Sequence, residues 1–278
     1  MARVCSPRRP CKSIHLVRSS FPSGSTGADG SVLAPRLVKM LRLVSRTGRV
    51  ERVEGVTGTQ PLHSVSLDSL QVGRIVRHDV HMPICSTPIM KQVDGILGMA
   101  GFGPVRIAVD FRHHQVAIDR SSRGSLLGFL DIRAVRTPGG LLVIPARVGG
   151  VAVEAVIDTG SPVTLGNAAL RKALLSRAGG VSKTPIYGVT RQISTGATAV
   201  APTLILGPVA IEHLPIVYSD VPIFREWNLQ RKPAVLIGTD ALRVAESLVL
   251  DYPRARVYIL PAPPPTSMLA ALDLPLGG

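Results

Sequence analysis

Alternating apolar and polar residues predict short β-strands along most of this chain. The clearest alternation covers residues 151–157, where every odd position is apolar, and it ends in Asp158 followed by a Thr-Gly-Ser turn. A mainly apolar run over 141–148 precedes it, and Gly149-Gly150 between the two predicts a hairpin. Gly160 permits a tight turn directly after the strand. Because a buried carboxylate costs free energy unless a neighbour uses or neutralises it, Asp158 is a candidate site residue.

The pattern around Asp158 has a counterpart 133 residues earlier, where Ser25 stands in place of the aspartate and Ser25-Thr26-Gly27-Ala28 in place of the whole turn. A helix is expected after each turn, over 34–43 and 167–176, and Asn167 is a suitable N-cap for the second. The same tripeptide then follows 30 residues after each turn, as Gly55-Val56-Thr57 and as Gly188-Val189-Thr190.

Later parts of the repeat keep the same order while the offset grows to 141. Glycines that end alternating runs predict hairpin turns at Gly73 and Gly207. Two apolar segments that end in glycine correspond, and so do two strand ends with an aspartate; they are 95–98 with 235–238, and Asp110 with Asp251. So many motifs in one order indicate a tandem repeat of one β-rich lobe.

The repeat divides the chain into five parts. The first lobe is expected to lack the entering hairpin of the second, because residues 18–24 contain no buried strand pattern. The segment between the lobes, rich in Ser, Arg and Gly, is expected to be a linker that adds one pairing strand. The expected parts are a flexible basic arm (1–24), a degenerate first lobe (25–118), the linker (119–140), a complete second lobe (141–260) and a Pro-rich tail (261–278).

Composition agrees with an all-β globular protein, because Val, Gly and Pro are abundant and Lys, Glu and Gln are scarce. The net charge of +14 does not predict nucleic-acid binding, since aromatic residues are only 4% and no basic helix is present. Cys5, Cys11 and Cys85 form no pattern of a disulfide framework or zinc site. No apolar run is long enough to span a membrane, and the basic N-terminus lacks the apolar core of a secretory signal, so no compartment is assigned.

These residues resemble the retropepsin- and pepsin-like aspartic peptidases, whose signature is two apolar residues followed by Asp-Thr-Gly and Ser or Ala. The resemblance covers residues 25–259 and is closest in the second lobe. It implies an all-β fold of two pepsin/retropepsin-like β-barrel lobes in tandem, with a cleft between them for a peptide or protein substrate. It implies no cofactor and no metal.

By this resemblance the function is an aspartic-type endopeptidase with Asp158 as the catalytic residue. In the family each lobe supplies one carboxylate, and two carboxylates about 3 Å apart share one proton. One takes a proton from water while the other protonates the substrate carbonyl, so no covalent intermediate forms. The implied supporting residues of the two turns are Thr159, Gly160 and Ser161, with Ser25, Thr26 and Gly27. The threonine is expected to be buried and Ser161 to hydrogen-bond the neighbouring carboxylate.

The resemblance also implies a hairpin flap that closes over the peptide. By position the flap-like turns are Gly55-Val56-Thr57 and Gly188-Val189-Thr190, and Tyr187 is a candidate lining residue. An apolar segment, Leu236-Ile237-Gly238, is expected to pack beneath the second-lobe aspartate.

Ser25 departs from the family pattern, because a hydroxyl cannot exchange protons as a carboxylate does. Three interpretations stay open. The chain is a catalytically impaired pseudo-peptidase that still binds extended peptides, or it forms a homodimer that pairs Asp158 with Asp158 of another copy. In the third, the natural N-terminus differs from residues 1–24 and carries the missing hairpin and aspartate.

Other motifs favour ordinary structural roles. His78 and His81 would point to opposite faces of a strand, so neither they nor His113-His114 predict a metal site. The glycines over 98–103 lack nucleotide-loop spacing, and no G-x-S-x-G elbow supports a serine nucleophile. The remaining carboxylates are interpreted as a structural turn residue, Asp240, and as turn formers, Asp110 and Asp251.

Overall fold

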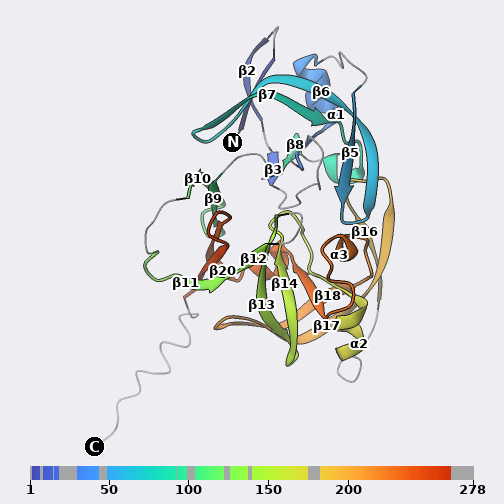
Figure 1. Cartoon of the computed structure of the whole chain (residues 1–278), viewed down its shortest axis with the longest axis vertical. Coiled ribbons are helices and arrows are strands. Elements are labelled where there is room, and N and C mark those ends of the chain that lie inside the picture. The colour runs from blue at the N-terminus through green and yellow to red at the C-terminus, as the bar shows by residue number, and fades with distance from the viewer. Residues whose placement is uncertain are drawn as a thin grey trace, which may run out of the picture.

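The computed structural model describes residues 2–6, 9–14, 16–18, 30–43, 49–91, 93–98, 104–121, 126–136, 140–174 and 182–263, the first three ranges by their backbone. These residues form β-strands and short helices, arranged as two similar lobes, one above the other in Figure 1. The prediction of an all-β chain with two lobes in tandem is therefore confirmed. In the part of the chain described, no helix is long and apolar enough to cross a membrane.

The second lobe, the lower one in Figure 1, is an eight-stranded sheet that curls back on itself. The strand order is β12-β13-β14-β19-β15-β18-β17-β16, and β13 also pairs with β17 across that path. Its elements are β12 (Val135–Arg136), β13 (Leu142–Val148), β14 (Val151–Ile157), β15 (Leu165–Gly166), α2 (Ala168–Leu174), β16 (Ser182–Tyr187), β17 (Ile193–Leu206), β18 (Val209–Tyr218), α3 (Ile223–Glu226), β19 (Ala234–Ile237) and α4 (Thr239–Leu242).

The first lobe repeats much of this order. The predicted hairpin turns are present in both lobes, and Gly73 and Gly207 adopt the same left-handed conformation, with φ of 57° and 58°. The elements of the first lobe are β1 (Ala2–Ser6), β2 (Arg9–Ile14), β3 (Leu16–Arg18), β4 (Val32–Leu33), α1 (Pro35–Leu41), β5 (Val50–Gly55), β6 (Gly58–Val72), β7 (Ile75–Pro83), the 3-10 helix η1 (Pro88–Lys91) and β8 (Gly95–Leu97).

Both lobes contain the same group of three paired strands, which we call the strand crossing. In the second lobe β19 lies between β14, which is parallel to it, and β15, which is antiparallel. In the first lobe β8 lies between parallel β3 and antiparallel β4. The register of β15 with β19 pairs Gly166 with Val235, and that of β4 with β8 pairs Leu33 with Gly95. In the second lobe the crossing brings the end of β14 and the start of β15 together, on either side of β19. In the first lobe it does the same for the end of β3 and the start of β4, on either side of β8.

The structure corrects the expectation of a flexible arm over residues 1–24. β1 and β2 form an antiparallel hairpin, β1 also pairs with β6, and β3 pairs with β8 as β14 pairs with β19. The first lobe therefore does have an entering hairpin. The apolar–polar pattern did not predict these strands, because the segment is basic and polar and shows little alternation. Ser25, Thr26 and Gly27 lie outside the described residues.

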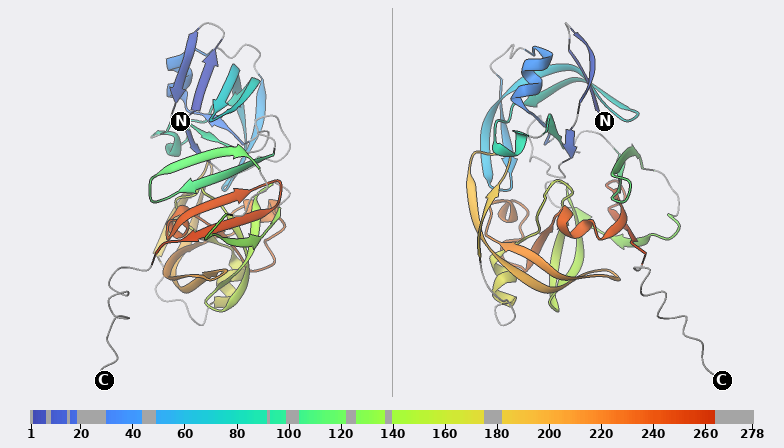
Figure 2. Two further views of the ribbon diagram at one scale, coloured as in Figure 1. Left: turned by 90° about the vertical axis from the view of Figure 1, so that its left-hand side faces the viewer. Right: turned by 180° about the vertical axis from the view of Figure 1, so that it is seen from behind.

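A further sheet joins the lobes, in the order β10-β9-β20-β21-β11, and we call it the inter-lobe sheet. Figure 2 shows the strands from the two lobes lying side by side in this sheet. One cluster of buried apolar residues includes residues of both lobes, from Leu33 to Ile259. The expected linker adds two strands instead of one, since β11 pairs with β21 and β12 with β13. The strands are β9 (Val105–Asp110), β10 (Gln115–Arg120), β11 (Leu130–Arg133), β20 (Ala245–Asp251) and β21 (Arg256–Pro261).

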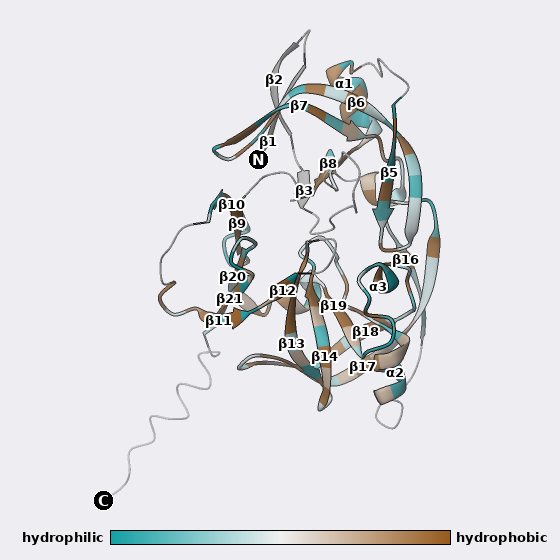
Figure 3. Ribbon diagram, in the orientation of Figure 1, coloured by the Kyte–Doolittle hydropathy of each residue, from teal (hydrophilic) through white to brown (hydrophobic). Residues whose placement is uncertain are grey.

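Hydropathy follows the fold. Apolar segments concentrate on β13, β14 and β19, which form the interior of the second lobe (Figure 3). All four residues of β19 are buried, and β14 is buried continuously from Ala155 to Ile157. A carboxylate that follows β14 is consequently delivered into a largely apolar region.

Candidate active site

Asp158 lies at the end of β14, where that strand runs beside β19. Its side chain is 0% exposed. Its Oδ1 accepts a hydrogen bond from the backbone N–H of Gly160 at 2.8 Å, and its own N–H donates to the carbonyl of Ile237 at 3.0 Å. The second bond continues the β14–β19 pairing by one residue. The parallel strand pair therefore fixes the backbone of Asp158, and the turn fixes its side chain.

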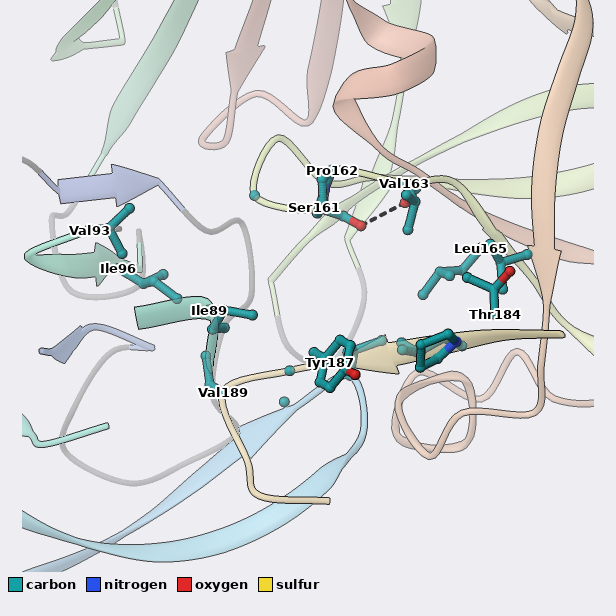
Figure 4. A pocket seen from close by; sticks show the side chains of 17 residues that line it. Ile89, Val93, Ile96, Ser161, Pro162, Val163, Leu165, Thr184, Tyr187 and Val189 are labelled. Carbon is teal, nitrogen blue, oxygen red and sulfur yellow. Dashed lines mark hydrogen bonds between the residues drawn. The ribbon is translucent and has the colours of Figure 1, made fainter. Parts of the chain in front are cut away.

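The next residues of the turn connect it to the segment that follows β19. The carbonyl of Ser161 accepts hydrogen bonds from both the N–H and the hydroxyl of Thr239. The Ser161 hydroxyl donates to the carbonyl of Val163 at 2.6 Å (Figure 4), whereas the family resemblance implied a bond to the neighbouring carboxylate. Thr159 and Gly160 are partly exposed, so Thr159 differs from the buried threonine that was expected.

A polar network holds this turn against the apolar-glycine segment, as predicted for Leu236-Ile237-Gly238. The Thr164 hydroxyl accepts a hydrogen bond from the N–H of Gly238 at 3.2 Å and donates to Oδ1 of Asp240 at 2.7 Å. Asp240 also accepts from the N–H of Thr164 through Oδ2 at 2.9 Å. A Cβ on Gly238 would lie 2.5 Å from the carbonyl oxygen of Val163, so only glycine fits. Asp240 thus has the structural role that the sequence suggested.

The first lobe keeps one part of this network. Ser31 stands 133 residues before Thr164, and its hydroxyl accepts a hydrogen bond from the N–H of Gly98 at 3.0 Å. Gly98 corresponds to Gly238, so the hydroxyl-to-glycine bond is present in both lobes. The residue two positions after Gly98 is Ala100, where the second lobe has Asp240. The first lobe therefore lacks both carboxylates of the second-lobe arrangement in its sequence.

The two Gly-Val-Thr turns meet each other. The hydroxyls of Thr57 and Thr190 are 2.8 Å apart, and the two residues are 3% and 2% exposed. A Cβ on Gly55 would lie 2.6 Å from a methyl group of Val189, and a Cβ on Gly188 would lie 2.7 Å from the Thr57 hydroxyl. Both glycines are therefore needed for this close approach.

Each turn also inserts its valine into the opposite lobe. Val56 of the first lobe belongs to a buried cluster of the second, with Leu165, Ile186 and Phe224. Val189 of the second lobe belongs to a buried cluster of the first, with Val53, Cys85 and Met90. The turns are thus exchanged between the lobes, which the sequence repeat alone did not reveal.

A pocket of about 460 Å³ lies between the lobes beside the Asp158 turn. Ser161, Pro162 and Val163 form one side of it, and Tyr187 and Val189 lie on the opposite side (Figure 4). Tyr187, proposed as a lining residue, is 46% exposed and borders the pocket. The first lobe contributes a wall that sequence reasoning missed, although three apolar residues close together around η1 and β8 were a usable signal. They are Ile89, Val93 and Ile96.

Two titratable groups outside the pocket have shifted pKa values. Hydrogen bonds from the backbone N–H and the ring of His113 lower the pKa of Asp110, and burial raises the pKa of Tyr218. The Asp110 bonds span three residues, as does the bond from the Arg254 N–H to Asp251, so both aspartates act as turn formers. The described residues contain no group of three or more metal-ligating side chains.

Comparison with known families agrees with this geometry. The family model described as aspartyl protease matches residues 25–100 and 144–241, one segment in each lobe. No curated protein sequence matches the chain at a significant level. The two matched segments together cover more than half of the sequence and contain both turns of the repeat. The chain therefore belongs to the aspartyl protease family.

Proposed function

We propose that this protein is an aspartic-type endopeptidase that binds an extended peptide in the inter-lobe pocket and uses Asp158 as its acid–base group. The observation that carries the proposal is the position of the Asp158 turn. Gly160 and Ser161, which follow the aspartate directly, border a pocket whose lining side chains are all uncharged. Glycine and valine of both flap-like turns border the same pocket. A peptide held there would lie between the turns and the carboxylate.

One carboxylate is enough for a balanced reaction. Asp158 takes a proton from water as the water oxygen adds to the peptide carbonyl carbon, which leaves an oxyanion. The protonated Asp158 then gives that proton to the amide nitrogen, the C–N bond breaks, and the oxyanion becomes the carbonyl of the new carboxylic acid. A second carboxylate would protonate the oxyanion and add roughly 10²- to 10⁴-fold. Ser25 offers a hydrogen bond at most, so slow hydrolysis is expected.

The rival candidate is a pseudo-peptidase that binds peptides in the same pocket without hydrolysis. Its support is the absence of any acidic residue before Asp29 in the sequence. A dyad formed by Asp158 residues of two copies has less support. In this chain β9 pairs with β20, and Val56 packs inside the second lobe, so the first lobe occupies the position that a second copy would need.

A peptide library incubated with the protein between pH 3 and pH 7 separates the candidates. The proposal expects cleavage that is strongest at acid pH, that stops with a statine-type transition-state mimic, and that disappears in Asp158→Asn. Binding of the mimic without cleavage would establish the pseudo-peptidase. A wild-type protein that neither cleaves nor binds would contradict both.

A further inference from the structure

The second-lobe turn is anchored on the first lobe by a cysteine. Cys85 lies two residues after the end of β7, next to Ile84, and is 0% exposed. Its Sγ lies 3.2 Å from the carbonyl oxygen of Val189 and 3.2 Å from the hydroxyl of Thr87. A carbonyl can only accept, so the thiol donates its single hydrogen to Val189. The Thr87 hydroxyl must then donate to the sulfur, which forms a chain of two hydrogen bonds ending at the turn.

Three further contacts hold the turns together. The Thr57 and Thr190 hydroxyls bond each other, the N–H of Arg191 donates to the side-chain carbonyl of Gln60 at 2.8 Å, and Val189 packs with Cys85. All of them cross between the lobes. Because Gly55, Val56, Gly188 and Val189 border the pocket, a peptide backbone can pass between the turns only when these contacts separate.

We propose that Cys85 is a positioning residue which, with the Thr57–Thr190 hydroxyl pair, latches the two turns closed over the inter-lobe pocket. Peptide entry and release then require the thiol and hydroxyl bonds to break. The identity of the ligand as a peptide rests on the proposed function, but the latch itself does not.

The second lobe offers a matched control for each half of the latch. Ser219 occupies the position in the second lobe that Cys85 occupies in the first. Leu33 forms a parallel bridge with Ile84, the residue before Cys85. In the same way Gly166 pairs in parallel with Tyr218, the residue before Ser219. The Ser219 hydroxyl donates to the carbonyl of Thr195 within its own lobe. Thr184 and Thr198 form a second hydroxyl pair, 2.6 Å apart, also within one lobe. Ser219→Ala and Thr198→Val therefore remove similar groups without touching the latch.

Thiol labelling measures the latch directly. In the full chain carrying Cys5→Ser and Cys11→Ser, Cys85 is the sole remaining thiol. Its rate of reaction with dithiobis(nitrobenzoate) under native conditions reports how often the turns separate. We expect protection relative to the urea-unfolded chain, a further slowing by a statine-type hexapeptide, and roughly three- to tenfold faster labelling in Thr57→Val, the value of one lost hydrogen bond. Thr198→Val should leave the rate unchanged.

The free energy of unfolding of each variant separates local from global opening. An equal change of labelling in Thr57→Val and Thr198→Val, or a change fully accounted for by lost global stability, would overturn the latch. So would labelling of the native protein as fast as that of the unfolded chain. Protection and the Thr57→Val effect without any response to the hexapeptide would retain the latch and contradict the peptide ligand.

The dissociation rate of the same hexapeptide tests the role of the thiol. Cys85→Ala should speed dissociation by roughly three- to tenfold, and Cys85→Ser, which restores a donor, should return it to within about twofold of wild type. Ser219→Ala should dissociate at the wild-type rate. If Cys85→Ser dissociates as fast as Cys85→Ala, packing and not the donated bond holds the turn, and the role assigned to the thiol is wrong.

Discussion

The two lobes share one strand crossing but place different polar residues on it. In the second lobe the crossing carries Asp158, Thr164 and Asp240, and the threonine links Gly238 to a carboxylate. In the first lobe Ser31 makes the bond to glycine alone. The bond common to both is the one that the fold needs. The carboxylates occur in one lobe only, so they are separable from the architecture.

The two lobes fill one equivalent pair of interior positions with side chains of different size. Gly166 in the second lobe faces Tyr218, and a Cβ on that glycine would lie 2.9 Å from the tyrosine ring. At the corresponding positions the first lobe has Leu33 and Ile84, which pair across the same bridge. A large residue opposite glycine and two medium residues fill similar space. The first lobe therefore differs from the second in detail while its interior is still filled.

Ser25→Asp is expected to have the largest effect, because it gives the first lobe the missing carboxylate. Peptide hydrolysis should rise by roughly 10²- to 10⁴-fold if the first-lobe turn holds the new side chain near Asp158. Values of kcat/KM at acid pH measure the gain, and Ser23→Asp, which adds the same charge two residues earlier, is the control. Equal activity in both variants and wild type would mean that the first lobe differs in more than one residue.

Asn167→Ala should destabilise the protein strongly, because the second lobe anchors α2 with a side chain that the first lobe lacks at Ala34. The amide of Asn167 donates to the carbonyls of Leu229 and Lys232, and its oxygen accepts from the N–H groups of Leu170 and Ala234. Losing these buried bonds should cost about 3–5 kcal/mol in urea unfolding.

Exposed Asn228, in a left-handed conformation with φ of 58°, is the control, and Asn228→Gly should change stability by less than about 1 kcal/mol. A similar cost for both asparagine variants would show that the Asn167 bonds contribute nothing specific.

Asp240→Ala should cost about 1–3 kcal/mol, because it leaves the N–H and hydroxyl of Thr164 without their acceptor. The first-lobe sequence has Ala100 at the corresponding position. Ser31, the counterpart of Thr164, needs no carboxylate because its hydroxyl donates to the carbonyl of Gly98 and accepts from the N–H of the same residue. Thermal or urea unfolding measures the loss. Asp220→Ala removes an exposed carboxylate that accepts a hydrogen bond from the N–H of Ala168, and it should cost less stability. A larger loss for Asp220→Ala than for Asp240→Ala would contradict the structural role of the Asp240 bonds to Thr164.

The smallest effect concerns Asp110, the first-lobe counterpart of Asp251. Its pKa lies below the ordinary 3.8 because of the His113 bonds, so its native form holds its proton less tightly than the unfolded chain. The stabilisation is therefore present above the ordinary pKa and is lost as the pH falls through the lowered one. NMR titration should show that His113→Ala, which removes the ring bond but keeps the backbone N–H bond, moves the midpoint part of the way up toward 3.8. An unchanged midpoint would remove this role of His113.

Much of the architecture was predictable because glycines and apolar alternation recur at a nearly constant offset. The hairpins at Gly73 and Gly207 and the position of Asp158 followed from that repeat. The strands before residue 19 did not, because their partners lie far along the chain and their sequence is basic and polar. The exchange of Val56 and Val189 also depends on how the lobes approach each other, which no local pattern contains.

In the proposed mechanism the second lobe supplies the working carboxylate, and the first lobe supplies a wall of the pocket and part of its cover. The most direct test is kcat/KM for one cleaved peptide in four proteins: wild type, Asp158→Asn, Ser25→Asp and the double variant. We predict that Asp158→Asn abolishes hydrolysis and that the gain from Ser25→Asp vanishes in the double variant, since paired carboxylates act as a unit. Activity in the double variant equal to that of Ser25→Asp would contradict the role assigned to Asp158.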